Sequence, residues 1–168
     1  MAEFVLVGGP AAGKTTVGGL LANRLGTAFM DADDAIEACA GMPITQIFAE
    51  HGEPYFRELE YQVISELLAC PGVLSLGGGA VMHDQLRALL RSDEQRVIWL
   101  RCNAASATLR VGQTAHRPLL AGDDVHSRVA QLHQSRAPLY AQVADLSIDT
   151  DDLSALEVVD LILAEVAK

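Results

Sequence analysis

GGPAAGKT, residues 8–15, directly follows the apolar run FVLV of residues 4–7. The spacing Gly-x-x-x-x-Gly-Lys-[Ser/Thr] between a strand and a helix is typical of a loop whose backbone N–H groups form a nest for nucleotide phosphates. Lys14 would reach the β- and γ-phosphates, the Thr15 hydroxyl would ligate Mg²⁺, and a helix over residues 16–25 would direct its positive end at the anion. Glycine-rich turns also join strands to helices in folds that bind no ligand. Here, however, the spacing of the motif, its Lys-Thr pair and its position between a strand and a helix all agree with a phosphate-binding loop. We therefore favour a nucleotide site.

Strand-like and helix-like segments alternate along the chain. Helical periodicity extends over residues 56–69 and again over residues 153–167. In the last segment the residues expected to face inward are Leu156, Val159, Leu163 and Val166. Five apolar runs, several of them continuous as in strands covered on both faces, are expected to be strands: residues 4–7, 28–30, 73–76, 97–100 and 146–148. This alternation predicts an α/β protein with a parallel sheet, in one domain over residues 1–168.

The composition argues against several classes of protein. Of the 168 residues, 50% are hydrophobic and 20% are charged, as in a globular domain. The net charge of −10 argues against binding to nucleic acid or attachment to an anionic membrane. Cys39, Cys70 and Cys102 lack metal-ligand spacing and are expected to be buried or free thiols. Because neither a signal-peptide pattern nor a membrane-spanning run is found, we expect a cytoplasmic protein, and we expect it to be monomeric.

Acidic residues follow the second predicted strand, at the edge where parallel sheets bind ligands. Asp31 could hold Mg²⁺ directly or through water, and Asp33 could accept a hydrogen bond from an attacking hydroxyl. Alternatively, Asp33 or Asp34 caps the next helix, with Glu37 completing a capping-box-like pair with Asp34. Three glycines, residues 77–79, follow the third strand and permit either close approach of a ligand or a tight turn.

Two arginines lie on helix faces that also carry apolar positions. Arg57 and Glu60 are three residues apart, so they share a face, either as an exposed ion pair or at the edge of a buried stripe. Arg136 falls on the apolar stripe of a helix that starts near residue 124. Pro138 predicts that this helix ends near Arg136, which would then complement the helix dipole. Because it faces inward, Arg136 could instead bind an anion such as a substrate carboxylate.

Residues 110–122 read RVGQTAHRPLLAG, and glycines near both ends with a central Arg-Pro predict a mobile lid. Arg117 would close over the phosphates and stabilise charge in transfer, or it could be an ordinary surface arginine. Trp99 is expected in the core. The histidines show no clustered ligand spacing and receive no role: His51, His83, His116, His126 and His133.

Taken together, these segments resemble the shikimate kinase family, in the nucleoside-monophosphate-kinase branch of the P-loop proteins. The matching stretches are GPAAGKTT, MDADDAIE, FRELE, LSLGGGAV, RPLLAG and SRAPLY, in the family's order and covering nearly the whole chain. The resemblance implies a three-layer α/β/α fold with a five-stranded parallel sheet of order 2-3-1-4-5. It also implies a substrate-binding helical region at about residues 32–60 and a lid at about residues 110–122. The implied activity is ATP-dependent phosphorylation of the 3-hydroxyl of shikimate, on the way to chorismate and the aromatic amino acids.

The resemblance also implies roles for individual residues. Lys14, Asp33 and Arg117 are the catalytic candidates, with Asp33 holding the ring hydroxyls and the attacking oxygen, while Thr15 and Asp31 serve Mg²⁺. The implied ATP site comprises Gly9, Pro10, Ala11, Ala12, Gly13, Lys14, Thr15, Thr16, Arg117 and, beside the adenine, Arg110. The implied shikimate site comprises Asp33, Phe48, Phe56, Glu60 and Gly78, together with Arg57, Arg136 and the backbone of Gly79, which grip the carboxylate. Family members often carry a basic or proline-containing loop where residues 149–152 read DTDD here.

Two other functions are compatible with a phosphate-binding loop. A kinase for another small molecule, such as gluconate, would use the same loop, but only a carboxylated ring acceptor explains Arg57, Arg136 and the three glycines together. A regulatory protein that binds nucleotide without catalysis would not need the set of Lys14, Asp33 and Arg117. The favoured interpretation requires Arg57 and Arg136, which are far apart in the sequence, to converge near Lys14.

Overall fold

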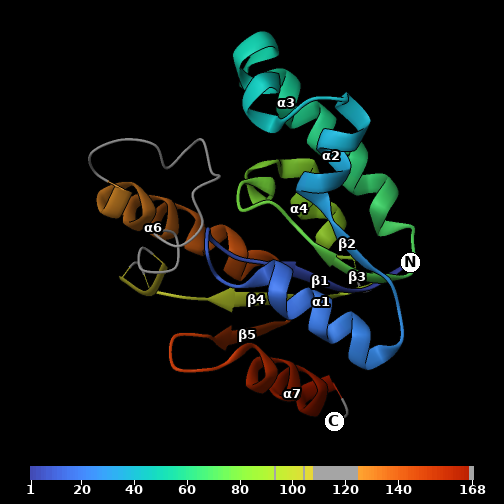
Figure 1. Ribbon diagram of the computed structural model, residues 1–168, viewed down its shortest axis with the longest axis vertical. Coiled ribbons are helices and arrows are strands. Elements are labelled where there is room, and N and C mark those ends of the chain that lie inside the picture. Colours follow the sequence, from blue (N-terminus) through green and yellow to red (C-terminus); the bar gives the residue numbers. More distant parts are fainter. Residues whose placement is uncertain (93, 104, 108–124, 167–168) are drawn as a thin grey trace.

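The computed structural model of the chain describes residues 1–92, 94–103, 105–107 and 125–166. Their strands form one parallel sheet of order β2-β3-β1-β4-β5 (Figure 1). The strands are β1 (Ala2–Val7), β2 (Phe29–Asp31), β3 (Gly72–Ser75), β4 (Arg96–Arg101) and β5 (Leu146–Asp149). Each of the five apolar runs therefore contributes a strand, and the predicted sheet order is confirmed.

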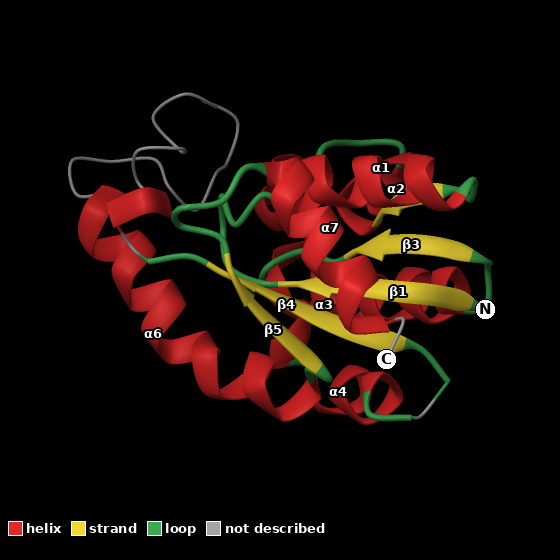
Figure 2. Cartoon of the chain, turned by 90° about the horizontal axis from the view of Figure 1, so that it is seen from below, coloured by secondary structure: helices red, strands yellow, loops and turns green. Residues whose placement is uncertain are grey.

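Helices cover both faces of this sheet (Figure 2). They are α1 (Lys14–Leu25), α2 (Ala32–Ala40), α3 (Ile44–Leu68), α4 (Asp84–Leu90), α6 (Val125–Val143), α7 (Ala155–Val166) and the short 3₁₀ helix η1 (Ala80–Met82). α1 and α7 pack together on one face, whereas α3, α4, η1 and α6 cover the other. The predicted three-layer α/β/α architecture is confirmed. None of the helices in the described part of the chain is long and apolar enough to span a membrane.

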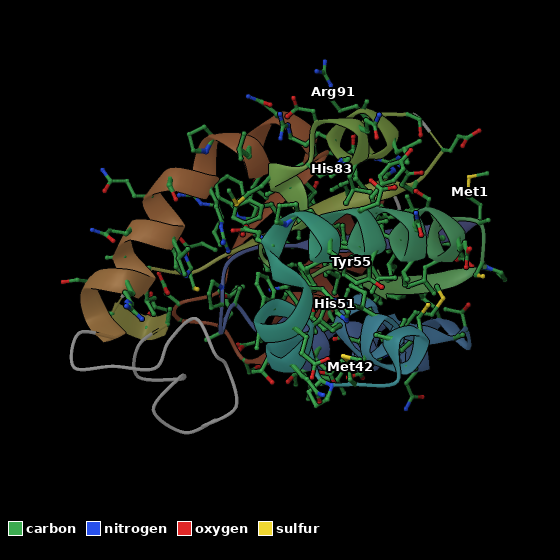
Figure 3. The ribbon with its side chains drawn as sticks, turned by 90° about the horizontal axis from the view of Figure 1, so that it is seen from above. Met1, Met42, His51, Tyr55, His83 and Arg91 are labelled. Atoms are coloured by element: carbon green, nitrogen blue, oxygen red, sulfur yellow. The ribbon has the colours of Figure 1, made fainter. Side chains whose placement is uncertain are left out.

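α3 is bent at Gly52, and residues on both sides of the bend pack with α2. Gly52, with φ 80° and ψ 173°, interrupts the helix, and Pro54 follows it. The left-handed φ is one that glycine adopts without strain, and proline is tolerated so close to the start of a new helical segment. His51 and Tyr55, whose ring centroids are 4.6 Å apart, flank the bend (Figure 3). The helix predicted over residues 56–69 is the part of α3 that follows this bend.

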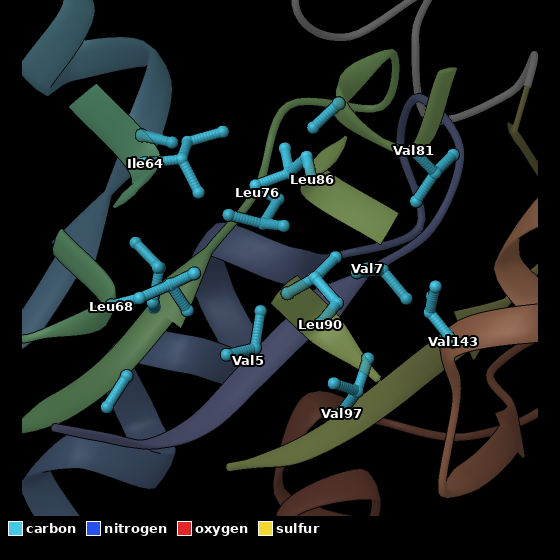
Figure 4. Packing of buried hydrophobic residues seen from close by; sticks show 14 of the residues in the cluster. Val5, Val7, Ile64, Leu68, Leu76, Val81, Leu86, Leu90, Val97 and Val143 are labelled. Carbon is cyan, nitrogen blue, oxygen red and sulfur yellow. The ribbon is translucent and has the colours of Figure 1, made fainter. Parts of the chain in front are cut away.

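The two largest core clusters lie on opposite faces of the sheet, because alternate residues of each strand point to opposite faces. Val5 and Val97 pack with Ile64 of α3 and Leu90 of α4 (Figure 4). Leu6, the next residue of β1, belongs to the cluster beneath α1 and α7. Burying one such side chain stabilises the fold by about 1.5–3 kcal/mol. Burial on both faces explains why the strands are continuously apolar.

The inward face of α7 agrees with the predicted one except at its first position. Val159 is buried, and Leu163 and Val166 pack partly buried against the same core cluster. Val158 and Ile162 are also buried, whereas Leu156, predicted to face inward, is 54% exposed. Because apolar residues occur around most of the circumference of this helix, its sequence pattern did not determine which face turns toward the sheet. Packing against α1 selects the face of Val158 and Ile162.

α6 continues through Pro138 rather than ending before it. Proline removes one helical hydrogen bond, but Pro138 and Gln134, the residue four positions earlier, both lie exposed, where water can replace that bond. Arg136 is therefore inside the helix and only 6% exposed. The prediction that it lies in the last turn, as a partner of the helix dipole, is wrong.

Candidate active site

The phosphate loop connects the end of β1 to the start of α1. Gly13, the residue before the helix, has φ 88°, a left-handed conformation that glycine adopts readily. Lys14 is 6% exposed, and its Nζ donates to the carbonyl oxygens of Gly8 at 2.9 Å and Gly9 at 3.0 Å. These bonds place the ammonium group inside the loop, at the positive end of α1, where a phosphate would be stabilised.

Asp31 links the phosphate loop to α2. Its Oδ2 accepts a hydrogen bond from the Thr15 hydroxyl at 3.0 Å, and its Oδ1 accepts one from the backbone N–H of Asp33 at 3.0 Å. Asp31 is therefore the N-cap of α2, and the predicted cap by Asp33 or Asp34 is wrong. Glu37 does not complete a capping box either, because its Oε1 accepts from the backbone N–H of Ile44 at 2.8 Å.

The Thr15 hydroxyl and the Asp31 carboxylate suit Mg²⁺, which prefers oxygen ligands. Among the described residues, no group of three or more His, Cys, Asp or Glu side chains could hold a metal ion. Magnesium commonly binds through one or two protein oxygens and completes its coordination with water and substrate phosphates. The residues present fit that kind of site.

Arg57 is held from several sides. Its Nη1 lies 2.6 Å from Glu60 Oε2, and its Nη2 lies 3.2 Å from Glu53 Oε1. Glu60 is only 2% exposed, so this is not an exposed surface pair. The guanidinium also lies 5.2 Å from the ring centroid of Phe56, which packs on Phe48 with ring centroids 4.5 Å apart. These contacts fix the orientation of Arg57.

The three glycines, residues 77–79, face three of the predicted site residues in turn. A Cβ at the first would lie 2.6 Å from Asp33 Oδ1, at the second 3.5 Å from Arg136 Nη1, and at the third 2.7 Å from Arg57 Nη1. Distances below 3.0 Å would force a neighbour to move. Close approach of polar side chains, rather than a turn alone, therefore explains the glycines at the first and third positions.

α6 brings Arg136 and Tyr140 to the same loop. Nε of Arg136 is buried and has no hydrogen-bond partner among the described residues. A buried donor normally has a partner, so the unpartnered N–H of Arg136 is available for a hydrogen bond to an anion. Tyr140, for which no role was predicted, donates its hydroxyl to the carbonyl of Gly78 at 2.6 Å and packs against Trp99. Its place one helical turn beyond Arg136 was the available signal.

The charges of the site act on one another. Burial raises the pKa of Glu60. The positive charge of Arg57 is the strongest effect that lowers this pKa, and Arg136 lowers it more weakly, whereas the negative charge of Asp33 raises it further. All three residues are therefore within electrostatic reach of one buried carboxyl. A Cβ at Gly78 would also lie 3.4 Å from the carbonyl oxygen of Gly8, which binds Lys14. Arg57 and Arg136 thus converge on one loop beside Lys14, as the favoured interpretation requires.

Two predicted residues and the predicted lid lie outside the described part of the chain. Arg110 and Arg117 belong to residues 108–124, as does the lid of residues 110–122. The acidic loop of residues 149–152, which begins at the end of β5, lies in the described part of the chain. Hydrogen bonds join it to the end of β4. Thr150 donates its N–H and its hydroxyl to the Arg101 carbonyl, and Asp151 accepts from Asn103.

Comparison with known proteins identifies the family. A family model described as "Shikimate kinase" matches residues 10–167. The chain belongs to the shikimate kinase family. Among curated members of this family, the shikimate kinase of Saccharopolyspora erythraea is 46% identical over 163 residues, which span 96% of this chain and 92% of the relative. The shikimate kinase of Thermobifida fusca is 44% identical over 162 residues, spanning 96% of this chain and 92% of the relative.

A solved structure of a family member has the same fold. Shikimate kinase from Acinetobacter baumannii, in complex with shikimate, superposes with a TM-score of 0.89 at 34% identity. The match covers 99% of this chain and 94% of that one. The family predicted from the sequence is thereby confirmed.

Proposed function

We propose that this chain catalyses the ATP-dependent phosphorylation of the 3-hydroxyl of shikimate, giving shikimate 3-phosphate and ADP. The observation that carries the proposal is the convergence of Arg57, Arg136 and Asp33 on the three glycines beside the phosphate loop. Membership of the shikimate kinase family supports the same conclusion. The product lies on the route to chorismate and the aromatic amino acids.

Arg57 and Arg136 would bind the carboxylate of the acceptor. Arg57 is oriented by Glu53 and Glu60, and Arg136 presents a buried N–H that no described residue accepts. Charge-assisted hydrogen bonds to a carboxylate are about twice as strong as neutral ones. With the carboxylate held there, Asp33 beside Gly77 is placed to receive a ring hydroxyl.

The residues suit in-line transfer of the terminal phosphoryl group. The 3-oxygen of the acceptor forms a bond to the γ-phosphorus as the bond to the β,γ-bridging oxygen breaks, and the hydroxyl proton passes to Asp33. Because such transition states are loose, positioning and charge neutralisation contribute more than a strong base. Lys14 neutralises phosphate charge, and Arg117, by the family's pattern, would add to it. Thr15 and Asp31 would hold Mg²⁺, which when bound supplies further positive charge to the phosphates.

An acceptor assay separates this function from its rivals. With ATP and Mg²⁺, release of ADP should be at least about a hundredfold more efficient with shikimate than with gluconate, because a site built for one set of polar groups rejects another. Faster turnover with gluconate would identify a different sugar-acid kinase. Binding of ATP without transfer to either acid would identify a nucleotide-binding regulator.

Substitution of Asp33 tests the role of its carboxylate. Asp33→Asn should lower kcat by about 10²- to 10⁴-fold through loss of the group that accepts the hydroxyl proton. The affinity for ADP, measured by calorimetry, should be unchanged, since Asp33 is proposed to contact only the acceptor. Asp34→Asn, an exposed neighbour on α2, is the matched control and should behave as wild type. An Asp33 variant that loses ADP affinity would place the residue at the nucleotide instead.

The remaining expectations belong to the same proposal. The chain acts as a single domain over residues 1–168, with its substrate-binding region at about residues 32–60 and a lid at about residues 110–122. We propose a cytoplasmic monomer whose partners are ATP and shikimate, without nucleic-acid or membrane binding. Light scattering on the purified protein checks the monomeric state.

A further inference from the structure

One face of α6 contacts both halves of the site. His133, Arg136 and Tyr140 are three and four residues apart, so they lie on the same side of the helix. Arg136 and Tyr140 face the three glycines, whereas His133 faces the phosphate loop. The reaction proposed above gives His133 no role.

The imidazole of His133 packs directly on the backbone of the phosphate loop. A Cβ at Gly9 would lie 2.4 Å from its Cε1 and 2.6 Å from its Nε2, so the ring occupies the space that a side chain would need. Nε2 also lies 3.4 Å from the carbonyl oxygen of Pro10. Cys102, just beyond β4, approaches the same place, with its Sγ 3.9 Å from Nε2 and 4.0 Å from the Pro10 oxygen.

The surroundings favour the uncharged imidazole. Burial lowers the pKa of His133, and the cations Lys14 of α1 and Arg136 of α6 lower it further, while the Pro10 carbonyl and Asp151 oppose the shift. A neutral imidazole carries one N–H, and a hydrogen bond to a carbonyl assigns that proton to Nε2. His133 therefore acts on the loop as a hydrogen-bond donor and as a packing surface.

We propose that His133 is a positioning residue for the phosphate loop: it packs on Gly9, donates Nε2–H to the Pro10 carbonyl, and so holds the loop in its phosphate-binding shape. A loop rich in glycine has many other conformations, and a contact that excludes them lowers the entropy lost when the nucleotide binds. The effect belongs to the nucleotide side of the site. This role of His133 extends the proposed function, but it does not depend on which acceptor the protein phosphorylates.

Two substitutions of His133 distinguish the contribution of its hydrogen bond from that of its size. His133→Leu keeps an apolar side chain but removes the donor, and should raise the KM for ATP and the Kd for ADP about three- to tenfold, the effect of one hydrogen bond. The KM for the acceptor should change less than about twofold, since Arg136 and Tyr140 are untouched. His133→Gln retains an N–H donor and should restore the nucleotide affinity. Gln134→Leu, an exposed neighbour on the same helix, is the control and should leave both constants unchanged.

The Kd for ADP, measured by calorimetry without acceptor, tests this inference even if shikimate proves not to be the substrate. An unchanged ADP affinity in His133→Leu would overturn it. Equal losses of affinity for the nucleotide and for the acceptor would also overturn it, because they would show general damage to α6. So would a His133→Gln variant as weak as His133→Leu. Should His133→Leu not fold, His133→Met provides the same test with a more flexible side chain.

Discussion

The two arginines of the proposed acceptor site differ in what surrounds them. Arg57 is paired with Glu53 and Glu60, so its position is set before any ligand binds. Arg136 is almost as deeply buried as the core residues, yet its Nε has no partner in the described part of the chain. A buried unsatisfied donor is unfavourable by about 1–3 kcal/mol, which the binding of an anion would recover.

Arg136→Met should weaken binding of the acceptor selectively. It keeps the apolar stem and removes a charge-assisted bond worth roughly 1.5–3 kcal/mol, so the KM for shikimate should rise about 10- to 150-fold. The KM for ATP should stay within about twofold, since the two sites use different groups. Steady-state kinetics at varied concentrations of each substrate measure both constants. Arg91→Met, at an exposed arginine just after α4 (Figure 3), is the control. An unaltered KM for shikimate would show that its carboxylate binds elsewhere.

Glu60 should make stability depend on pH in an unusual direction. Burial raises its pKa in the folded protein above 4.5, so the stability that it contributes is present below pH 4.5 and is lost as the pH rises through the folded-state pKa. Glu60→Gln cannot ionise and escapes that loss. The free energy of unfolding of Glu60→Gln minus that of wild type should therefore increase between about pH 4 and pH 7. Urea unfolding across this range measures it, and a difference that is constant or decreasing would contradict the prediction.

At the scale of elements, the connection from β3 to η1 is shaped by the side chains that approach it. Gly79→Ala would place a Cβ 2.7 Å from Arg57 Nη1, and Arg57 cannot move without disturbing its ion pair with Glu60. We expect the KM for shikimate to rise at least about tenfold, through displacement of a charge-assisted contact. Kinetics with both substrates measure this rise.

The same substitution elsewhere in the chain serves as the control. Gly19 lies inside α1, where an added Cβ would meet nothing within 4 Å. Gly19→Ala should leave the kinetics unchanged and stabilise the protein by about 0.5–1 kcal/mol, because alanine loses less backbone entropy in a helix. Equal kinetic behaviour of the two alanine variants would show that the glycine at residue 79 is not needed for space.

For the whole molecule, ligands that bind only the folded state should raise its melting temperature. At a hundred times its Kd a ligand stabilises by about 2.7 kcal/mol, which corresponds to roughly 5–11 °C for a domain of this size. ADP and shikimate should each produce such a shift. In Arg136→Met the shift with ADP should persist while the shift with the same concentration of shikimate falls sharply. Loss of both shifts would mean that the substitution damages the molecule as a whole.

Local pattern alone determined a large part of this protein. The apolar runs located all five strands, and the spacing of glycines, lysine and threonine located the phosphate loop, because these signals lie within a few neighbouring residues. The motifs together identified the family and, through it, the order of the sheet. Periodicity was less informative where a helix is apolar around most of its surface, as the exposure of Leu156 shows.

Tertiary structure decided the contacts between residues far apart in the chain. The hydrogen bond from Thr15 to Asp31 joins the phosphate loop to the start of α2. α6 continues past Pro138 because the proline lies exposed, where water can replace the missing helical bond. The helical spacing of His133, Arg136 and Tyr140 shows only that they share a face. The hydrogen bond of the Tyr140 hydroxyl to Gly78 and the contact of His133 with the phosphate loop depend on how α6 packs. A helical pattern shows which residues share a face, but the packing of that helix against the sheet determines what the face contacts.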